Sequence, residues 1–224
     1  MEKIYRLSKL KITVWLSFAA ALFYSSWPLG FLLNPSVGHH DLASQLEAPH
    51  QPYSWVFIAL DVLTGISLVI VGAMQLRIRR STTMTLVISS YMLFGALVAI
   101  AALLPLSCDP TLGQCGPLIR APRVIVHGAS SIISVNMLLI SVLLLTKMVY
   151  EGRRRKIIQG VFGLILGGWL VFGIGSLLEM AHHIHSNFLQ YYFITVCSLS
   201  IILVVSVVSY FEEEVSPPPV PRQD

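Results

Sequence analysis

Charged side chains are scarce in this sequence: they make up 12% of its 224 residues, whereas 55% of the residues are hydrophobic. Soluble domains carry about twice that share of charged residues, which cover a surface exposed to water. The mean hydropathy is +0.74, a value typical of membrane proteins. The composition therefore excludes a soluble globular domain and makes the lipid bilayer the expected surroundings.

The few charges that are present are mostly positive, with a net charge of +4 and a pI of about 9.1. A basic protein could bind nucleic acid if its Lys and Arg residues were spread over one domain. Here they stand in short clusters between apolar segments, which is the pattern that orients a protein in a bilayer. Nucleic acid is therefore not an expected partner.

Cysteine is also rare, with three residues, which excludes a fold built on disulfides. Cys197 lies in an apolar segment and is expected to act as a small apolar side chain. Cys108 and Cys115 lie in one loop, separated by six residues, and we predict a disulfide between them in an oxidising compartment. We find no convincing internal repeat, which argues against a transporter built from repeats.

Six apolar segments are each about 20 residues long, enough to cross roughly 30 Å of hydrocarbon as a helix. They lie at about 12–33, 54–75, 83–106, 124–146, 157–178 and 189–210. We therefore predict an all-α integral membrane protein, a bundle of six transmembrane helices in one domain covering residues 1–210. Residues 211–224 are acidic and rich in proline, and they are predicted to form a disordered cytoplasmic tail.

The distribution of positive charge predicts the orientation in the membrane. Twelve of the fifteen Lys and Arg residues lie before the first span, between the second and third, or between the fourth and fifth. Basic segments stay in the cytoplasm, so both termini are predicted to be cytoplasmic. All seven His then fall on the outer side, together with five acids: Asp41, Glu47, Asp61, Asp109 and Glu179. This asymmetry indicates a polar functional site at the outer end of the bundle.

Asp61 is the most unusual of these residues, because it lies about seven residues, or about 10 Å, inside the second span. An acid at the centre of a span costs about 2.5–3.5 kcal/mol, and less near the interface, and it usually faces a partner inside the bundle. Two interpretations remain open. Asp61 moves protons in a catalytic site, or it ties two helices together through a hydrogen bond.

His127 begins a polar stripe in the fourth span, followed by Ser130, Ser131 and Ser134 at helical spacing. Serines often hold membrane helices together without a further role. An imidazole can in addition bind a metal or carry a proton. We therefore treat His127 as a candidate metal ligand and Ser131 as a candidate catalytic residue.

Another cluster of polar residues closes the fifth span. Glu179 and His183 are four residues apart, and His182 and His185 are three apart, so a continuing helix would place each pair on one face. With His127, the three His are candidate ligands for zinc or another divalent metal, and Glu179 is a candidate catalytic acid. The alternative is that these His are simply solvated at the membrane interface.

Aromatic residues mark the outer ends of the first two spans. Trp27, Tyr53 and Trp55 lie there, at the depth at which amphipathic rings prefer the boundary between lipid and water. We interpret them as an interfacial aromatic belt and not as part of a binding site.

Three stretches of the sequence together resemble a known family. They are LNPSVGHHDLASQLEAPHQPYSWVFIALDVLTG from Leu33, LPLSCDPTLGQC from Leu104 and VHGASSIIS from Val126. In these stretches the chain resembles the six-span, mainly bacterial membrane proteins catalogued as domain of unknown function 998. The resemblance covers nearly the whole chain apart from the tail. It implies a bacterial plasma membrane protein and no particular activity.

Two shorter resemblances bear on function. The stretch NPSVGH with the second span resembles a eukaryotic six-span family that includes a factor for remodelling lipid anchors and modulators of autophagy. The chain is also similar to seven-span hydrolases typified by alkaline ceramidases, whose zinc is held by three His beside an Asp and a Ser. The matching types here are Asp61, His127, Ser131 and His182 or His185. The chain departs from those hydrolases in having six spans and no HxxxH pattern in the last one.

Three functions are open at this point. The first is a metal-dependent membrane hydrolase of a lipid or lipid-linked substrate, in which His127 helps to hold the metal and Asp61 or Glu179 moves protons. The second is a non-enzymatic scaffold or lipid-handling partner of other membrane proteins. The third is a proton-coupled transporter in which His and Asp61 titrate.

Overall fold

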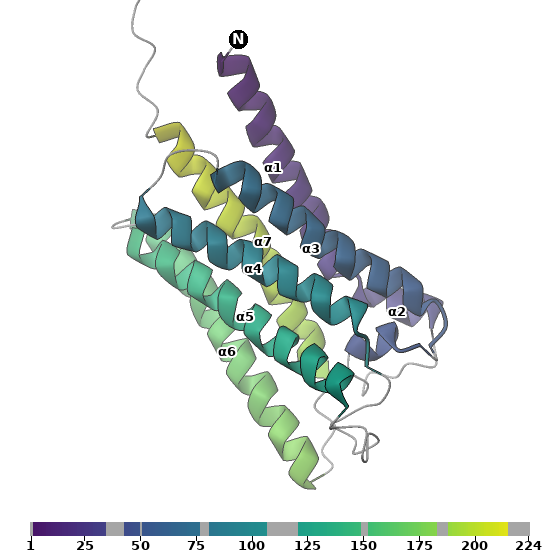
Figure 1. The fold of residues 1–224 in the computed structure, drawn as a ribbon. Coiled ribbons are helices and arrows are strands. Elements are labelled where there is room, and N and C mark those ends of the chain that lie inside the picture. Colours follow the sequence, from purple (N-terminus) through teal and green to yellow (C-terminus); the bar gives the residue numbers. More distant parts are fainter. Residues whose placement is uncertain are drawn as a thin grey trace, which may run out of the picture.

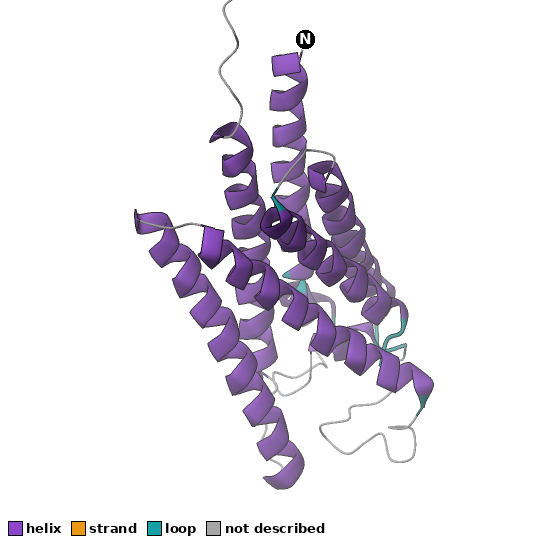
Figure 2. Cartoon of the chain, turned by 60° about the vertical axis from the view of Figure 1, so that its left-hand side comes forward, coloured by secondary structure: helices purple, strands orange, loops and turns teal. Residues whose placement is uncertain are grey.

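The computed structural model describes residues 2–34, 43–49, 51–76, 81–106, 121–148, 152–182 and 188–214. Every regular element in these residues is a helix (Figure 2). In chain order the elements are α1 (Glu2–Tyr24), α2 (Trp27–Leu33), the short 3-10 helix η1 (Ala43–Glu47), α3 (Ser54–Leu76), α4 (Thr82–Leu103), α5 (Pro122–Met148), α6 (Gly152–His182) and α7 (Phe188–Glu214).

Within the described residues, five helices are long and apolar enough to cross a membrane, and there are six spans if α1 and α2 together form one. The prediction of an all-α bundle of membrane-spanning helices is therefore confirmed. α1 begins and α7 ends at the same end of the bundle, which we call the terminal end (Figure 1). The opposite end, which carries α2 and η1, is the distal end. The cytoplasmic location of the termini stays a prediction.

The first predicted span is broken near the distal end. α1 ends at Tyr24, and α2 starts at Trp27 with its axis bent by 46° from that of α1. Pro28 stands in the first turn of α2, where its missing N–H costs no helical hydrogen bond. A backbone hydrogen bond of 2.9 Å from Leu29 N to Ser26 O starts the new helix. The bend turns the aromatic face of α2 into the bundle.

The last helix is longer than the sequence predicts. α7 continues to Glu214, so the first four residues of the predicted disordered tail, 211–214, are helical. Glutamate is a good helix former, and a helix already held by its neighbours can extend past them. Residues 215–224 lie outside the described part of the chain.

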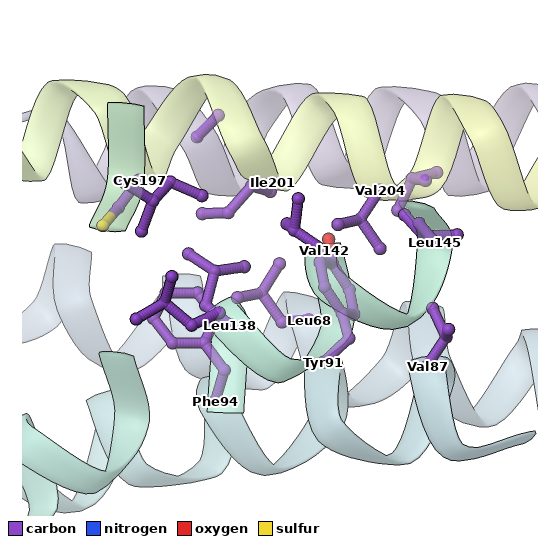
Figure 3. Close-up of a cluster of buried hydrophobic side chains, with 14 of the residues drawn as sticks. Leu68, Val87, Tyr91, Phe94, Leu138, Val142, Leu145, Cys197, Ile201 and Val204 are labelled. Atoms are coloured by element: carbon purple, nitrogen blue, oxygen red, sulfur yellow. The ribbon is translucent and has the colours of Figure 1, made fainter. Parts of the chain in front are cut away.

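The terminal half of the bundle has an apolar core. α4 packs along α3 on one side and along α5 on the other. Side chains from six helices, α1 and α3 to α7, belong to this core. Figure 3 labels members from α3, α4, α5 and α7, including Leu68, Val87, Leu138, Leu145 and Ile201. Because lipid tails are as apolar as these side chains, close packing and not the hydrophobic effect holds such helices together.

Small residues allow α3 and α4 to approach closely. A Cβ added to Gly65 would overlap the carbonyl oxygen of Gly95, and a Cβ added to Gly95 would lie 2.6 Å from the Cβ of Leu68. Glycines at such a crossing let the two backbones come into van der Waals contact. A larger side chain at either position would have to push the helices apart.

Hydroxyl groups add hydrogen bonds between helices. Ser141 of α5 donates to Val87 O of α4 at 3.2 Å. Thr64 of α3, one turn beyond Asp61, donates to Ala20 O of α1 at 3.2 Å. These contacts are the structural role that Ser and Thr often have in membrane bundles. They also leave Thr64 with no direct part in a site around Asp61.

Candidate functional site

A cavity of about 180 Å³ lies in the distal half of the bundle. Its wall is formed by α1, α2, η1 and each of the helices α3 to α7. Most lining side chains are apolar or aromatic, and a few are ionisable or hydroxyl groups. The polar members that matter below are Glu47, Asp61, His127 and Ser131. A mostly apolar cavity with a few polar groups is the usual form of a ligand site.

The short helix η1 brings Glu47 into the wall of this cavity. Leu46 and Glu47 are only 2% and 5% exposed. Leu46 lies against Gly30 of α2, where an added Cβ would be 2.7 Å from Leu46 Cδ1. The backbone N–H of Ala43 donates to Gln190 Oε1 of α7 at 2.6 Å. η1 is therefore fixed to two helices and forms part of the packed distal end.

A tight turn then leads from η1 into α3. Gln51 N donates to Ala48 O at 2.9 Å, and Asn34 Nδ2 donates to Gln51 Oε1 at 2.7 Å. Tyr53 adopts the left-handed conformation with φ of 58°, which non-glycine residues rarely adopt outside turns. The turn sends α3 back past η1, so Asp61 comes to lie beside Glu47.

The side chains of Glu47 and Asp61 are hydrogen-bonded to each other. An ionised carboxylate has no proton to donate, so this bond requires one of the two groups to be protonated. Burial raises the pKa of Glu47 well above its usual value, and the neighbouring carboxyl of Asp61 raises this pKa further. The two acids therefore hold a proton between them at the cavity wall.

Asp61 was predicted as a site residue, whereas its partner Glu47 was noted only as an acid on the outer side. In the sequence, Glu47 belongs to a polar stretch outside the spans, where an acid needs no partner. Two signals could have drawn attention to it. Its neighbours Leu46 and Ala48 are apolar, and an acid inside a span, such as Asp61, needs a partner from somewhere.

His127 lies in the cavity wall with a defined ring orientation. Its Nδ1 is 3.0 Å from Ala101 O and 3.1 Å from Leu104 O. A carbonyl oxygen only accepts, so Nδ1 carries the proton and Nε2 has a lone pair in the neutral ring. Nε2 has no hydrogen-bond partner among the described residues, although the side chain is only 6% exposed. This nitrogen is available to water, a metal or a substrate.

Ser131 lines the same cavity one turn after His127. Its hydroxyl donates to His127 O at 2.9 Å, and Ser134 donates to Ser131 O at 2.8 Å. Both bonds are made within α5 and favour the structural interpretation of the serine stripe. As a nucleophile, Ser131 would first have to release its bond to the backbone.

The predicted aromatic belt divides into two groups. Trp55 and Tyr53 are 69% and 53% exposed, as expected for rings at a membrane interface. Trp27 instead lines the cavity, and its Nε1 donates to Thr195 Oγ1 of α7 at 3.3 Å. Its ring centroid lies 5.1 Å from that of Tyr191. Assigning Trp27 to the belt was wrong, because the bend after Tyr24 turns its ring inward.

Several predicted site residues lie outside what the structure describes. They are the side chains of Glu179 and His182, together with His183, His185, Cys108 and Cys115. Glu179 and His182 follow the cavity residue Phe172 by seven and ten residues on α6, or about 10 and 15 Å along the helix. Within the described residues, no group of three or more His, Cys, Asp or Glu is placed to hold a metal ion.

The fold and the cavity define a multi-pass helical membrane protein with an acid pair and a histidine inside the bundle. A family model described as "Protein of unknown function (DUF998)" matches residues 17–209. The chain belongs to this family, which confirms the resemblance seen in the sequence. The match extends from α1 into α7, so it spans every helix around the cavity. No curated protein and no solved structure matches the chain.

Proposed function

We propose that this protein is a membrane-embedded hydrolase acting on a lipid or a lipid-linked substrate. The observation that carries the proposal is that a proton-holding acid pair and a histidine with an unpartnered ring nitrogen line one cavity inside the bundle. Hydrolysis needs one group that takes a proton from water and another that gives a proton to the leaving group. The cavity lining offers a candidate for each task.

In this scheme His127 and Asp61 have complementary roles. Nε2 of His127 takes the proton from the attacking water, while the Nδ1 hydrogen bonds hold the ring in place. Asp61 gives the proton that it shares with Glu47 to the leaving oxygen or nitrogen. The acyl chains of the substrate remain in the bilayer beside the helices.

The proposal includes the divalent metal predicted from the sequence, with zinc as the first candidate. A metal-binding His usually donates its other ring N–H to a carbonyl or carboxylate, and Nδ1 of His127 does so. Further ligands would come from His182, His183 or His185, and Glu179 is a second candidate proton carrier. A metal at Nε2 would lower the pKa of bound water and supply hydroxide at neutral pH. The lone pair of Nε2 would then hold the metal, so Glu179 would take the water proton in place of His127.

We further propose that the protein lies in the bacterial plasma membrane with its distal end facing outward. The predicted disulfide between Cys108 and Cys115 would then form in an oxidising compartment. The outward orientation is supported by the distribution of positive charge, since the basic segments, which are expected to stay in the cytoplasm, lie toward the terminal end. The bacterial membrane is what the family resemblance implies.

The first test is elemental analysis of the full-length protein purified in detergent without a His tag, beside a His127→Ala/His182→Ala double variant. We expect near-stoichiometric zinc or another divalent metal in the wild type only, together with hydrolysis of lipid esters or amides. Lipid hydrolysis by a wild-type protein that holds no metal would contradict the metal site and support the hydrolase. A wild type that stays metal-free after incubation with zinc and hydrolyses none of these lipids contradicts the hydrolase.

The shared proton of Glu47 and Asp61 also favours a second candidate function, proton-coupled transport. Paired acids inside a bundle are common in proton relays. Uptake of a substrate into proteoliposomes that requires a pH gradient, and that disappears in Asp61→Asn, would establish transport. Uptake that persists without a pH gradient would rule out proton coupling.

A further inference from the structure

Within the described part of the chain, the acid pair has no hydrogen-bond donor outside the pair itself. Apart from their bond to each other, neither Glu47 nor Asp61 has a hydrogen bond or salt bridge to any described residue. Glu47 is nevertheless only 5% exposed, and both side chains line the cavity. Buried carboxyl oxygens are normally supplied with donors by the protein or by a bound group. The missing donors point to a ligand that carries polar hydrogens.

His127 gives an independent indication of the same kind. Its side chain is more than nine-tenths buried and lines the cavity, and Nε2 has no donor among the described residues. Acceptors therefore face the cavity from two separate walls, one formed by η1 and α3 and the other by α5. The proposed reaction uses Nε2 and the proton that the acid pair shares, and the carboxyl oxygens of the pair that do not hold this proton stay available for ligand recognition.

The remaining wall suits a positive charge. The described residues that line the cavity include no Lys or Arg. Ring faces attract cations, because the π-electrons give each face a partial negative charge. Five aromatic residues from α1, α2, α6 and α7 contribute to the wall: Tyr24, Trp27, Trp169, Phe172 and Phe193.

The size and chemistry of the cavity narrow the class of cation. A metal ion is disfavoured at the acid pair, since no three ligating side chains converge in the described residues. The volume of about 180 Å³ is below the roughly 300–1,000 Å³ of pockets that enclose a whole drug-sized molecule. It therefore admits a headgroup and not its acyl chains. A quaternary ammonium has no N–H, so it would leave the carboxyl oxygens without donors.

We propose that the Glu47–Asp61 pair binds the primary ammonium group of the ligand, so that the substrate of the site carries an amine. The source of this group is either an amine-bearing lipid headgroup or a soluble primary amine. Binding of the ammonium group does not require catalysis. Only the claim that the bound amine is a substrate rests on the proposed function.

The test measures ligand binding to the full-length protein in detergent, by calorimetry. The probes are short-chain phosphatidylethanolamine, the matching phosphatidylcholine and phosphatidylglycerol, and free ethanolamine. We expect the ethanolamine lipid to bind roughly tenfold or more tightly than the other two lipids, since only its headgroup donates N–H bonds to the acids. The double variant Glu47→Gln/Asp61→Asn, which keeps the shape of both side chains and removes the negative charge of the proton-sharing pair, is expected to weaken its binding by about tenfold or more.

Ser206→Ala serves as the control, because Ser206 lies on α7 outside the cavity lining, is exposed, and donates to Ile202 O within its own helix. This variant is expected to bind the ethanolamine lipid like the wild type. Free ethanolamine that binds as tightly as the lipid would support ammonium recognition and identify a soluble amine as the source. Equal binding of the ethanolamine and choline lipids overturns the proposal, and so does unchanged binding by Glu47→Gln/Asp61→Asn.

The lipid comparison uses the wild type alone, so it stays decisive if Glu47→Gln/Asp61→Asn does not fold. It also separates the two proposals. Selective binding of the ethanolamine lipid without hydrolysis would contradict the hydrolase and support the ammonium site. If the protein instead bound and hydrolysed the ethanolamine and choline lipids equally well, this result would support the hydrolase and contradict the ammonium site.

Discussion

The terminal and distal halves of the bundle are built by the same helices but bury different things. In the terminal half, α3, α4, α5 and α7 meet through aliphatic side chains such as Leu138 and Leu145 (Figure 3). In the distal half, these helices and their neighbours surround a cavity of about 180 Å³. Its wall contains the acids Glu47 and Asp61 and the imidazole of His127.

This difference indicates which half serves function. A cavity forgoes van der Waals contacts, and a buried acid in a membrane protein is costly, so both lower stability. The terminal half is packed mainly with apolar side chains, and the buried polar side chains described there are uncharged. The hydroxyl of Ser141 is bonded to a neighbouring helix, whereas that of Ser209 has no hydrogen-bond partner among the described residues. A chain that needed only to fold could fill the distal half with aliphatic side chains as well. We infer that the terminal half stabilises the bundle and the distal half carries the chemistry.

The largest expected effect on stability follows from a cavity created in the core of the terminal half. Leu138 is fully buried, and Leu138→Ala is expected to lower the free energy of unfolding by about 2–5 kcal/mol. Leu143 lies on the same helix but is 39% exposed, and Leu143→Ala is expected to change it by less than about 0.5 kcal/mol. Reversible unfolding in detergent measures both. Equal losses at the two positions would show that the terminal half is not a tightly packed core.

A smaller loss of stability is expected when the crossing of α3 and α4 is widened. Gly65→Ala places a Cβ against Gly95 O, and overpacking of this kind costs about 1–3 kcal/mol. Gly163 on α6 is the matched control, because nothing lies within 4 Å of a Cβ built there. Gly163→Ala is expected to leave stability unchanged or to raise it, since alanine favours helix. A stable Gly65→Ala variant would contradict the close approach of α3 and α4.

In the distal half, the raised pKa of Glu47 predicts how stability depends on pH. The folded protein holds a proton that the unfolded chain releases at the usual carboxyl pKa, so the free energy of unfolding falls as pH rises above that value. The contribution is complete below the usual pKa and is lost as pH rises through the folded-state pKa. Glu47→Gln removes this titration, so its unfolding temperature is expected to fall less between about pH 4 and about pH 8. Parallel curves for variant and wild type would exclude a buried, proton-holding Glu47.

The two halves were not equally predictable from the sequence. A membrane helix satisfies its own backbone hydrogen bonds, so an apolar run of about 20 residues is enough to reveal it. The cavity depends on contacts between distant residues, such as Ala43 with Gln190, which are 147 positions apart. The local sequence pattern around either residue does not predict such a contact. Asp61 and His127 were recognised because polar groups in a span are unusual, whereas Glu47 looked ordinary in its loop.

Trp27 provides the finest test of the difference between a built site and a solvated surface. Trp27→Phe removes the donor to Thr195 and keeps most of the ring, so we expect a loss of about 0.5–1.5 kcal/mol in unfolding free energy. Trp55→Phe, at a ring that is 69% exposed, is expected to cost less than about 0.5 kcal/mol. Because Trp27 also forms part of the cavity wall, its variant is expected to weaken ligand binding, whereas Trp55→Phe leaves binding unchanged. If the two variants behaved identically in both measurements, Trp27 would be an interfacial aromatic residue like Trp55 and would not contribute to the proposed site.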